Sequence, residues 1–131
     1  MAKSRKTKQM PLAKKDSDLY SKATSGNTIA TCFFNNKGGV GKTTLVANLA
    51  AELSINFNAK ILVVDADPQC NITQLVLGED YSYDLYSKQD PSTIYSVIHP
   101  LSLGKGFGDE FPIHKSDDWG FDMIVGDPRS C

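Results

Sequence analysis

The sequence predicts an incomplete α/β fold in which helices flank a mostly parallel sheet. An apolar run at residues 28–35 is followed by a glycine-rich loop, a helical segment and a second apolar run at 60–65. A strand, a helix and a second strand in this order form a βαβ unit, whose strands are parallel. A third apolar run occupies residues 121–125. Because open sheets of this class usually have more than three strands, we expect part of the sheet to be missing.

The composition is that of a globular protein with one domain at most. The 131 residues are 40% hydrophobic and 22% charged, which excludes a wholly disordered chain, a collagen-like chain and a highly basic nucleic-acid coat. No apolar run reaches the roughly 20 residues of a membrane helix, and no apolar segment of a secretory signal follows the basic N-terminus. We therefore expect a cytoplasmic protein without a membrane partner. Its three cysteines, Cys32, Cys70 and Cys131, match no metal or redox spacing and are expected to be reduced.

Charge is distributed unevenly along the chain. Residues 1–27 carry a net charge of +5, whereas residues 28–131 carry −6. The first segment has few large apolar residues, so it cannot bury enough surface to offset its chain entropy, and we interpret it as a basic flexible arm. Two roles stay open for the arm: an electrostatic contact with nucleic acid, or a solvated extension that keeps the protein soluble.

The βαβ unit has a recognisable pattern in each of its parts. Residues 28–35 (TIATCFFN) are β-branched and aromatic without clean alternation, which predicts a strand covered on both faces. From Lys42 to about Asn56, leucines recur every four residues and predict a helix with a core-facing stripe. The stripe consists of Leu45, Leu49 and Leu53, with Val46 and Ala50 beside them. Residues 60–65 (KILVVD) are typical of a second buried strand.

The second half of the chain predicts shorter elements. We expect a short helix at 71–77, a polar loop at 80–89, a long loop at 101–118 and a third strand at 121–125. Another helix is expected from Asp90, as the N-cap, and Pro91, at the first position, and Pro100 is expected to end it.

A glycine-rich loop, NKGGVGKTT at residues 36–44, lies between the first predicted strand and the following helix. A phosphate chain approaches backbone N–H groups closely only where side chains are small, as at Gly38, Gly39 and Gly41. The backbone of Val40 belongs to the same loop, and the N-terminus of the helix adds a partial positive charge. The loop therefore predicts a nucleotide-binding site.

The side chains that close this loop suit a nucleoside triphosphate with Mg²⁺. Lys42 can reach the β- and γ-phosphates, the Thr43 hydroxyl can ligate Mg²⁺, and Thr44 can bond the α-phosphate.

Two aspartates follow the second predicted strand. Asp65 and Asp67 lie at the carboxyl end of this strand, where ligands bind in parallel sheets. In an extended backbone, residues two positions apart point their side chains the same way. One carboxylate can act on the Mg²⁺ water shell while the other orients an attacking water. The alternative for this segment is a turn held by Asp67 and Pro68.

The loop departs from the ordinary P-loop pattern G-x-x-x-x-G-K-[ST], because Asn36 stands where that pattern has its first glycine and Lys37 adds an early lysine. With these residues the chain resembles the deviant Walker A group of P-loop NTPases, which includes ParA-type partition ATPases, MinD-type ATPases and the nitrogenase iron protein. The resemblance covers residues 28–78 well and residues 91–131 more weakly.

The segment D-x-D-P-Q-x-N at residues 65–71 is similar to that of the ParA branch. The resemblance implies that Asp67 orients the attacking water and that Asp65 acts on the metal or as a switch residue. Residues 121–129 (FDMIVGDPR) also resemble the ParA strand that precedes Walker B, which implies that the Walker B aspartate is absent from this chain. The alternative is that residues 123–127 are themselves the Walker B strand.

What the resemblance implies as a whole is that residues 28–131 are the N-terminal part of an ATPase that hydrolyses ATP with Mg²⁺. In the group, two subunits form a homodimer around ATP and each gives its early lysine, here Lys37, to the partner's phosphates. Further implied partners are non-specific DNA and a ParB-like centromere-binding protein, in plasmid or chromosome partition. Two alternatives stay open: a MinD-like ATPase that positions cargo or binds membranes, and an inactive truncated fragment that acts as a binding module.

Overall fold

The computed structural model describes residues 26, 28–35, 37–107 and 110–130. The chain divides into two compact units, residues 1–38 and 39–131. Apart from Gly26, the arm predicted for residues 1–27 lies outside the described residues, as do Asn36 and Cys131.

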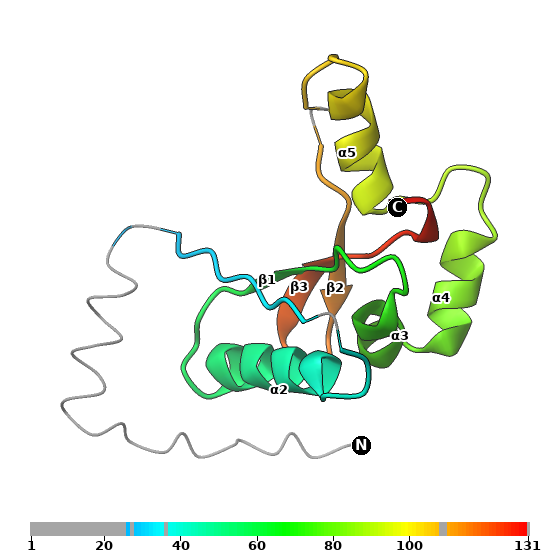
Figure 1. Ribbon diagram of the computed structural model, residues 1–131. Helices are drawn as coiled ribbons and strands as arrows, with labels where there is room; N and C mark the ends of the chain where they lie inside the picture. Colours follow the sequence, from blue (N-terminus) through cyan, green and yellow to red (C-terminus); the bar gives the residue numbers. More distant parts are fainter. Residues whose placement is uncertain (1–25, 27, 36, 108–109, 131) are drawn as a thin grey trace, which may run out of the picture. The chain divides into compact units, whose positions relative to one another are not determined.

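The second unit is a three-stranded mixed sheet with helices packed on it (Figure 1). Its strands are β1 (Leu62–Val64), β2 (Ile113–Ser116) and β3 (Phe121–Ile124), in the order β1-β3-β2. Strand β3 runs parallel to β1 and antiparallel to β2. The helices are α2 (Lys42–Ile55), α3 (Asn71–Leu77), α4 (Glu79–Tyr86) and α5 (Ile94–Ser102), followed by the 3₁₀ turn η1 (Pro128–Ser130). The α/β fold class is confirmed, and so are the helices predicted near 42–56 and at 71–77 and the strands within 60–65 and 121–125.

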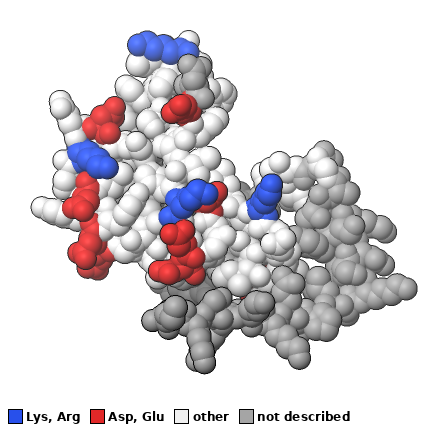
Figure 2. Space-filling view, turned by 180° about the vertical axis from the view of Figure 1, so that it is seen from behind, with Lys and Arg blue, Asp and Glu red and all other residues white. Residues whose placement is uncertain are grey.

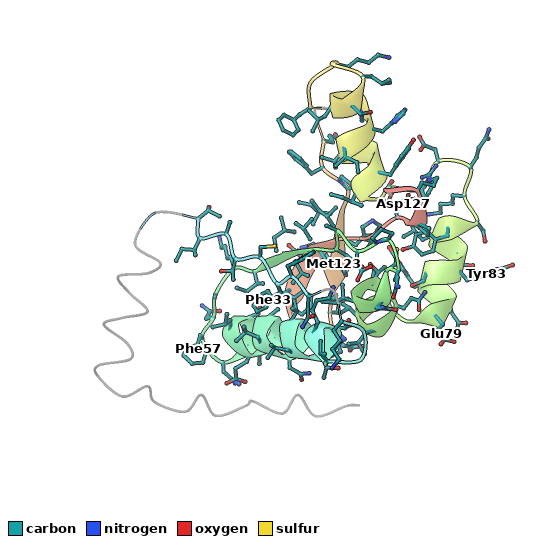
Figure 3. All side chains as sticks on the ribbon, viewed as in Figure 1. Phe33, Phe57, Glu79, Tyr83, Met123 and Asp127 are labelled. Carbon is teal, nitrogen blue, oxygen red and sulfur yellow. The ribbon has the colours of Figure 1, made fainter. Side chains whose placement is uncertain are left out.

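The core lies on one face of the sheet, where α2, α3 and α4 contribute to it. Side chains alternate along a strand, and the register places Val63, Phe121 and Met123 on this covered face, where all three are buried. Met123 lies in the interior of the unit (Figure 3). On the opposite face, Leu62 and Val64 are each 49% exposed, so β1 is buried on one face rather than on both as a fully buried strand would be.

The core-facing stripe predicted on the first helix is confirmed for Ala50, which is buried, and for Val46, which packs against the core, but it is wrong for Leu45 and Leu49. In α2 the buried residues are Ala47 and Ala50, whereas Leu45 is 58% and Leu49 is 41% exposed. Two small alanines on the buried face allow the α2 backbone to lie close to β3 and α3. Spacing alone predicted an apolar stripe, but apolar residues occur around most of α2, so the pattern could not select the face that packs.

The strand predicted at residues 28–35 is not formed. All eight residues are exposed and have no regular secondary structure, and Phe34 is 82% exposed. A strand depends on hydrogen bonds to a neighbouring strand, so a β-prone composition does not produce one by itself.

The predicted loops at 80–89 and 101–118 each contain a regular element. Helix α4 begins with Glu79 and Asp80, whose negative charges are favourable at a helix N-terminus, and it buries Leu85 in the core. Strand β2 forms because β3 supplies its pairing partner a few residues later in the chain.

The last helix, α5, begins later and ends later than predicted. Its N-cap is Thr93 rather than Asp90, because the Thr93 hydroxyl accepts from the Tyr95 N–H at 3.3 Å and the Ile94 N–H donates to the Val125 carbonyl at 2.8 Å. Pro100 lies inside the helix. A proline removes only its own N–H, and the Pro100 carbonyl still accepts from the Lys105 N–H at 3.0 Å.

Acidic and basic side chains are interspersed on the described surface that Figure 2 shows. That face therefore presents no continuous basic patch among its described residues. In the described part of the chain, none of the helices has the length and apolar character needed to cross a bilayer.

Candidate nucleotide site

The glycine turn before α2 has the backbone of a phosphate-binding loop. Gly39 and Gly41 have φ of 72° and 81°, in the left-handed region that favours glycine, and no atom lies within 4 Å of where their Cβ atoms would be. Gly41 is the N-cap of α2 and gives it no side-chain cap. The N–H groups of the first helical turn have no acceptor within the helix, so they can donate to an anion.

The structure brings two of the predicted site residues together. Lys42 Nζ lies 3.2 Å from Asp67 Oδ2, although the two residues are 25 positions apart, and each side chain is 32% exposed. Beside Lys42 in the first turn of α2, Thr43 is half-buried and Thr44 is exposed. The lysine, both threonines and the uncapped N-terminus thus lie within one turn of the helix.

The loop after β1 fixes Asp67 by further hydrogen bonds. Asp67 Oδ1 accepts from the Gln69 N–H at 3.0 Å, and the Asp67 carbonyl accepts from the Cys70 N–H at 2.9 Å. The bond from Gln69 and then the ion pair with Lys42 lower the pKa of Asp67, despite partial burial. Asp67 is therefore ionised at neutral pH. The predicted turn at Asp67 and the predicted carboxylate role are compatible in this geometry.

Asp65 is buried, with 3% of its surface exposed, and accepts three hydrogen bonds. Its Oδ2 accepts from the Thr73 hydroxyl at 2.6 Å and the Thr73 N–H at 3.2 Å, and its Oδ1 accepts from the Asp67 N–H at 3.1 Å. Burial raises the pKa of Asp65, and these donors offset part of that effect. A cation that used Asp65 directly would have to compete with these internal donors, so an action through water fits the site better than direct ligation.

Lys37 and Gly38 belong to the first unit, and Val40 belongs to the second. Lys37 is exposed, and its N–H donates to Asn35 Oδ1 at 2.8 Å. Val40 is 46% exposed. An exposed lysine has the freedom to meet a second molecule, which the expected role of Lys37 requires.

The donor set fits Mg²⁺ bound together with a nucleotide rather than a preformed metal centre. Among the residues that the structure describes, no group of three or more His, Cys, Asp or Glu side chains is arranged to hold a metal ion. Mg²⁺ in phosphate sites keeps several waters and takes few protein ligands, so such a site does not need a cluster of this kind.

A buried network behind the site was missed from the sequence. Thr73 of α3 has no exposed surface, and its Oγ1 accepts from the Gly126 N–H at 3.0 Å. Tyr86 of α4 donates to the Gly126 carbonyl at 2.9 Å. A Cβ at Gly126 would lie 2.9 Å from both Asp65 Oδ2 and Cys70 Sγ, so only glycine fits. No spacing rule links residues 53 positions apart, and Thr73 is one of several polar residues of α3, so the sequence gave no signal that singled it out.

A second buried carboxylate, Asp127, lies between the exit of β3 and the start of α5 (Figure 3). It accepts from the Thr93 hydroxyl at 2.5 Å and from three Arg129 donors, N, Nε and Nη2, at 2.8–2.9 Å. Arg129 also lies over the Tyr95 ring, 4.5 Å from its centroid. Burial alone would raise the pKa of Asp127, but the bonds from Arg129 and Thr93 outweigh burial and lower it to about 2.

Comparisons with known proteins agree with this architecture. The chain is 40% identical over 67 residues to the chromosome-partitioning ATPase Soj of Thermus thermophilus, a match that covers 51% of this chain and 26% of that protein. It is 53% identical over 86 residues to the chromosome partitioning protein ParA of Myxococcus xanthus, covering 62% and 29%. The solved structure of protein DIP2308 from Corynebacterium diphtheriae superposes with a TM-score of 0.66 at 38% identity, over 74% of this chain and 35% of that one.

These matches confirm the resemblance to ParA-type partition ATPases and the P-loop NTPase-like fold. The chain spans only about a quarter to a third of the length of these relatives. Residues 27–124 match the family AAA_31, which is described as an AAA domain. The chain therefore belongs to the AAA_31 family of AAA domains.

Proposed function

We propose that this chain is the nucleotide-binding part of a cytoplasmic ParA-like ATPase that acts in plasmid or chromosome partition. The observation that carries the proposal is the pairing of Lys42 with Asp67 at 3.2 Å, next to a glycine turn and an uncapped helix N-terminus. A cation, free backbone donors and an ionised carboxylate in one place are what ATP binding and water attack on a γ-phosphate need.

We propose a role for each residue of the site. The backbone of Gly38, Gly39, Val40 and Gly41 and the first turn of α2 bind the phosphate chain, and Lys42 neutralises the β- and γ-phosphates. Thr44 bonds the α-phosphate. Asp67 accepts a hydrogen bond from the attacking water and orients it, while Asp65 holds the Asp67 backbone in place.

Thr43 would hold Mg²⁺, with Asp65 acting on it through water. When bound, Mg²⁺ supplies charge neutralisation on the phosphate oxygens. The uncapped α2 N-terminus and the half-buried Thr43 support this assignment.

The wider assembly that we propose is a homodimer that encloses ATP. Lys37 of each subunit would reach the phosphates of the other and stabilise negative charge there during hydrolysis. The similarity to Soj and ParA supports non-specific DNA and a ParB-like protein as the remaining partners.

The test is equilibrium binding of a fluorescent ATP analogue with Mg²⁺ to the full chain, for wild type and Lys42→Ala. A charge-assisted hydrogen bond contributes about 1.5–3 kcal/mol, so we expect Lys42→Ala to weaken binding about 10- to 100-fold. Lys115→Ala is the matched control, because Lys115 is 80% exposed and pairs with Asp122 at 3.9 Å on the opposite face of the sheet. Equal binding by wild type and Lys42→Ala would refute the proposal.

Asp67→Asn gives an opposite expectation in the same experiment. It removes the carboxylate that competes with phosphate for Lys42, so binding is expected to be unchanged or tighter while hydrolysis is lost. Binding weakened as much as in Lys42→Ala would show that Asp67 contributes to ground-state binding instead.

The role of Lys37 predicts a different pattern in a protein that dimerises. Lys37→Ala is expected to reduce ATP-dependent dimerisation, measured by light scattering, and turnover much more than nucleotide binding by the monomer. Unchanged dimerisation and turnover would exclude an action across the dimer.

A further inference from the structure

Thr73 has a hydroxyl group whose hydrogen bonds are fully determined. The Gly126 N–H can only donate, so Thr73 Oγ1 accepts from it at 3.0 Å. The single hydroxyl hydrogen is then available for Asp65 Oδ2 at 2.6 Å. Because Thr73 has no exposed surface, water cannot replace either partner.

The Asp65 carboxylate accepts this hydrogen bond and also binds the neighbouring loop, so it links Thr73 to the Asp67 backbone. Its second contact with α3 is the Thr73 N–H at 3.2 Å, and its other oxygen accepts from the Asp67 N–H at 3.1 Å. The orientation of the carboxylate is thus fixed from α3 on one side and fixes the Asp67 backbone on the other.

Asp67 also accepts bonds from the Gln69 and Cys70 N–H groups, but these donors belong to its own loop, whereas Asp65 ties the Asp67 N–H to the side chain of α3 that holds Asp65. Ala66 and Gln69 are exposed, and Cys70 adopts a left-handed backbone at φ 55°, which is unfavourable for a non-glycine residue. With its N–H held by Asp65, Asp67 directs Oδ2 to Lys42.

We propose that Thr73 is a positioning residue for Asp67, acting through the Asp65 carboxylate to hold the Asp67 backbone where its side chain meets Lys42. This inference rests on the proposed function, because it gives Asp67 the role of orienting water. Thr73 itself touches neither the phosphate loop nor Lys42 in this chain of contacts.

The test compares two substitutions at Thr73 in the full chain without nucleotide. Thr73→Val keeps the shape of the side chain and removes the hydroxyl, whereas Thr73→Ser keeps the hydroxyl. Amide hydrogen exchange and the NMR chemical shift of the Asp67 N–H report directly on its bond to Asp65. We expect Thr73→Val to accelerate exchange at Asp67 about tenfold and move its shift, and Thr73→Ser to restore wild-type values.

Thr93→Val is the matched control. Thr93 is also a fully buried threonine whose hydroxyl donates to an aspartate, but its partner is Asp127. It should leave the Asp67 signal unchanged even if it reduces stability as much as Thr73→Val does.

Two results would overturn the positioning role: an Asp67 amide that is unaffected in Thr73→Val, or one that responds equally to Thr93→Val. Because nucleotide is absent, these outcomes are independent of ATP binding. Failure of the chain to bind the ATP analogue would instead overturn the proposed function.

Discussion

Replacing Asp127 with Asn tests whether the buried carboxylate between β3 and α5 stabilises the fold. The surroundings lower its pKa from the ordinary 3.8 to about 2. That difference corresponds to about 2.5 kcal/mol in favour of the folded state when the group is ionised. Since only 1% of the Asp127 side chain is exposed, solvent screening does not reduce this value much. We therefore expect Asp127→Asn to lower the free energy of unfolding by about 2–3 kcal/mol at pH 7.

The pH dependence has a definite sign. A carboxylate with a lowered pKa stabilises the fold fully above its unfolded pKa, near 4, and loses this contribution as the pH falls through about 2. About half of the difference between wild type and Asp127→Asn should remain at pH 3, and little at pH 2. Urea unfolding followed by the fluorescence of Trp119, the single tryptophan, measures both values.

Asp122→Asn is the control for this experiment, because Asp122 pairs with the exposed Lys115 at 3.9 Å on the surface of the sheet. Such pairs contribute about 0–1 kcal/mol, so the control should unfold almost as wild type does. A deficit for Asp127→Asn below about 1 kcal/mol at pH 7, or one that is equal at pH 3 and pH 7, would refute the reasoning.

Two further predictions concern the packing behind Asp65. Gly126→Ala inserts a Cβ 2.9 Å from Asp65 Oδ2 and Cys70 Sγ and is expected to destabilise the fold by about 1–3 kcal/mol in urea unfolding, whereas Gly38→Ala, with nothing within 4 Å, should be neutral. Equal stabilities would mean that the contact relaxes without strain. Cys70 is 1% exposed, and burial and then the neighbouring aspartates raise its pKa, so its thiol should react with a disulfide reagent only after unfolding, while the exposed Cys32 reacts at once. Rapid labelling of Cys70 in the folded protein would contradict this burial.

Most of the fold that the sequence predicted consists of elements with strong local signals. Helix α3 was predicted at its observed bounds, and α2 begins at Lys42 because Gly41 precedes it. Elements that depend on distant partners were missed. Helix α4 has a polar sequence and relies on burial of Leu85, and β2 relies on pairing with β3. The predicted strand at 28–35 fails for the same reason, since composition favours a strand but does not supply a neighbour.

The residues of the candidate site also differ in whether a local sequence signal predicts them. Lys42 and Asp67 were recognisable because each lies in a motif whose spacing reflects its chemistry, and the structure brings them into contact. Thr73 and Gly126 belong to no such motif. Their bond joins α3 to the exit of β3 across 53 positions, and only the folded chain reveals it.

The ion pair between Lys42 and Asp67 also means that the positive charge of the lysine beside the glycine turn has an anionic partner within the chain itself. A polyphosphate that binds here must therefore displace the Asp67 carboxylate from Lys42, rather than bind to an unpaired lysine. A small inorganic anion would then gain little binding free energy from Lys42 alone. This favours ligands that also accept hydrogen bonds from the N–H groups of the first turn of α2. On the function that we propose, the same exchange would release the Asp67 carboxylate when a phosphate takes its place beside Lys42, which couples the release of the carboxylate to ligand binding.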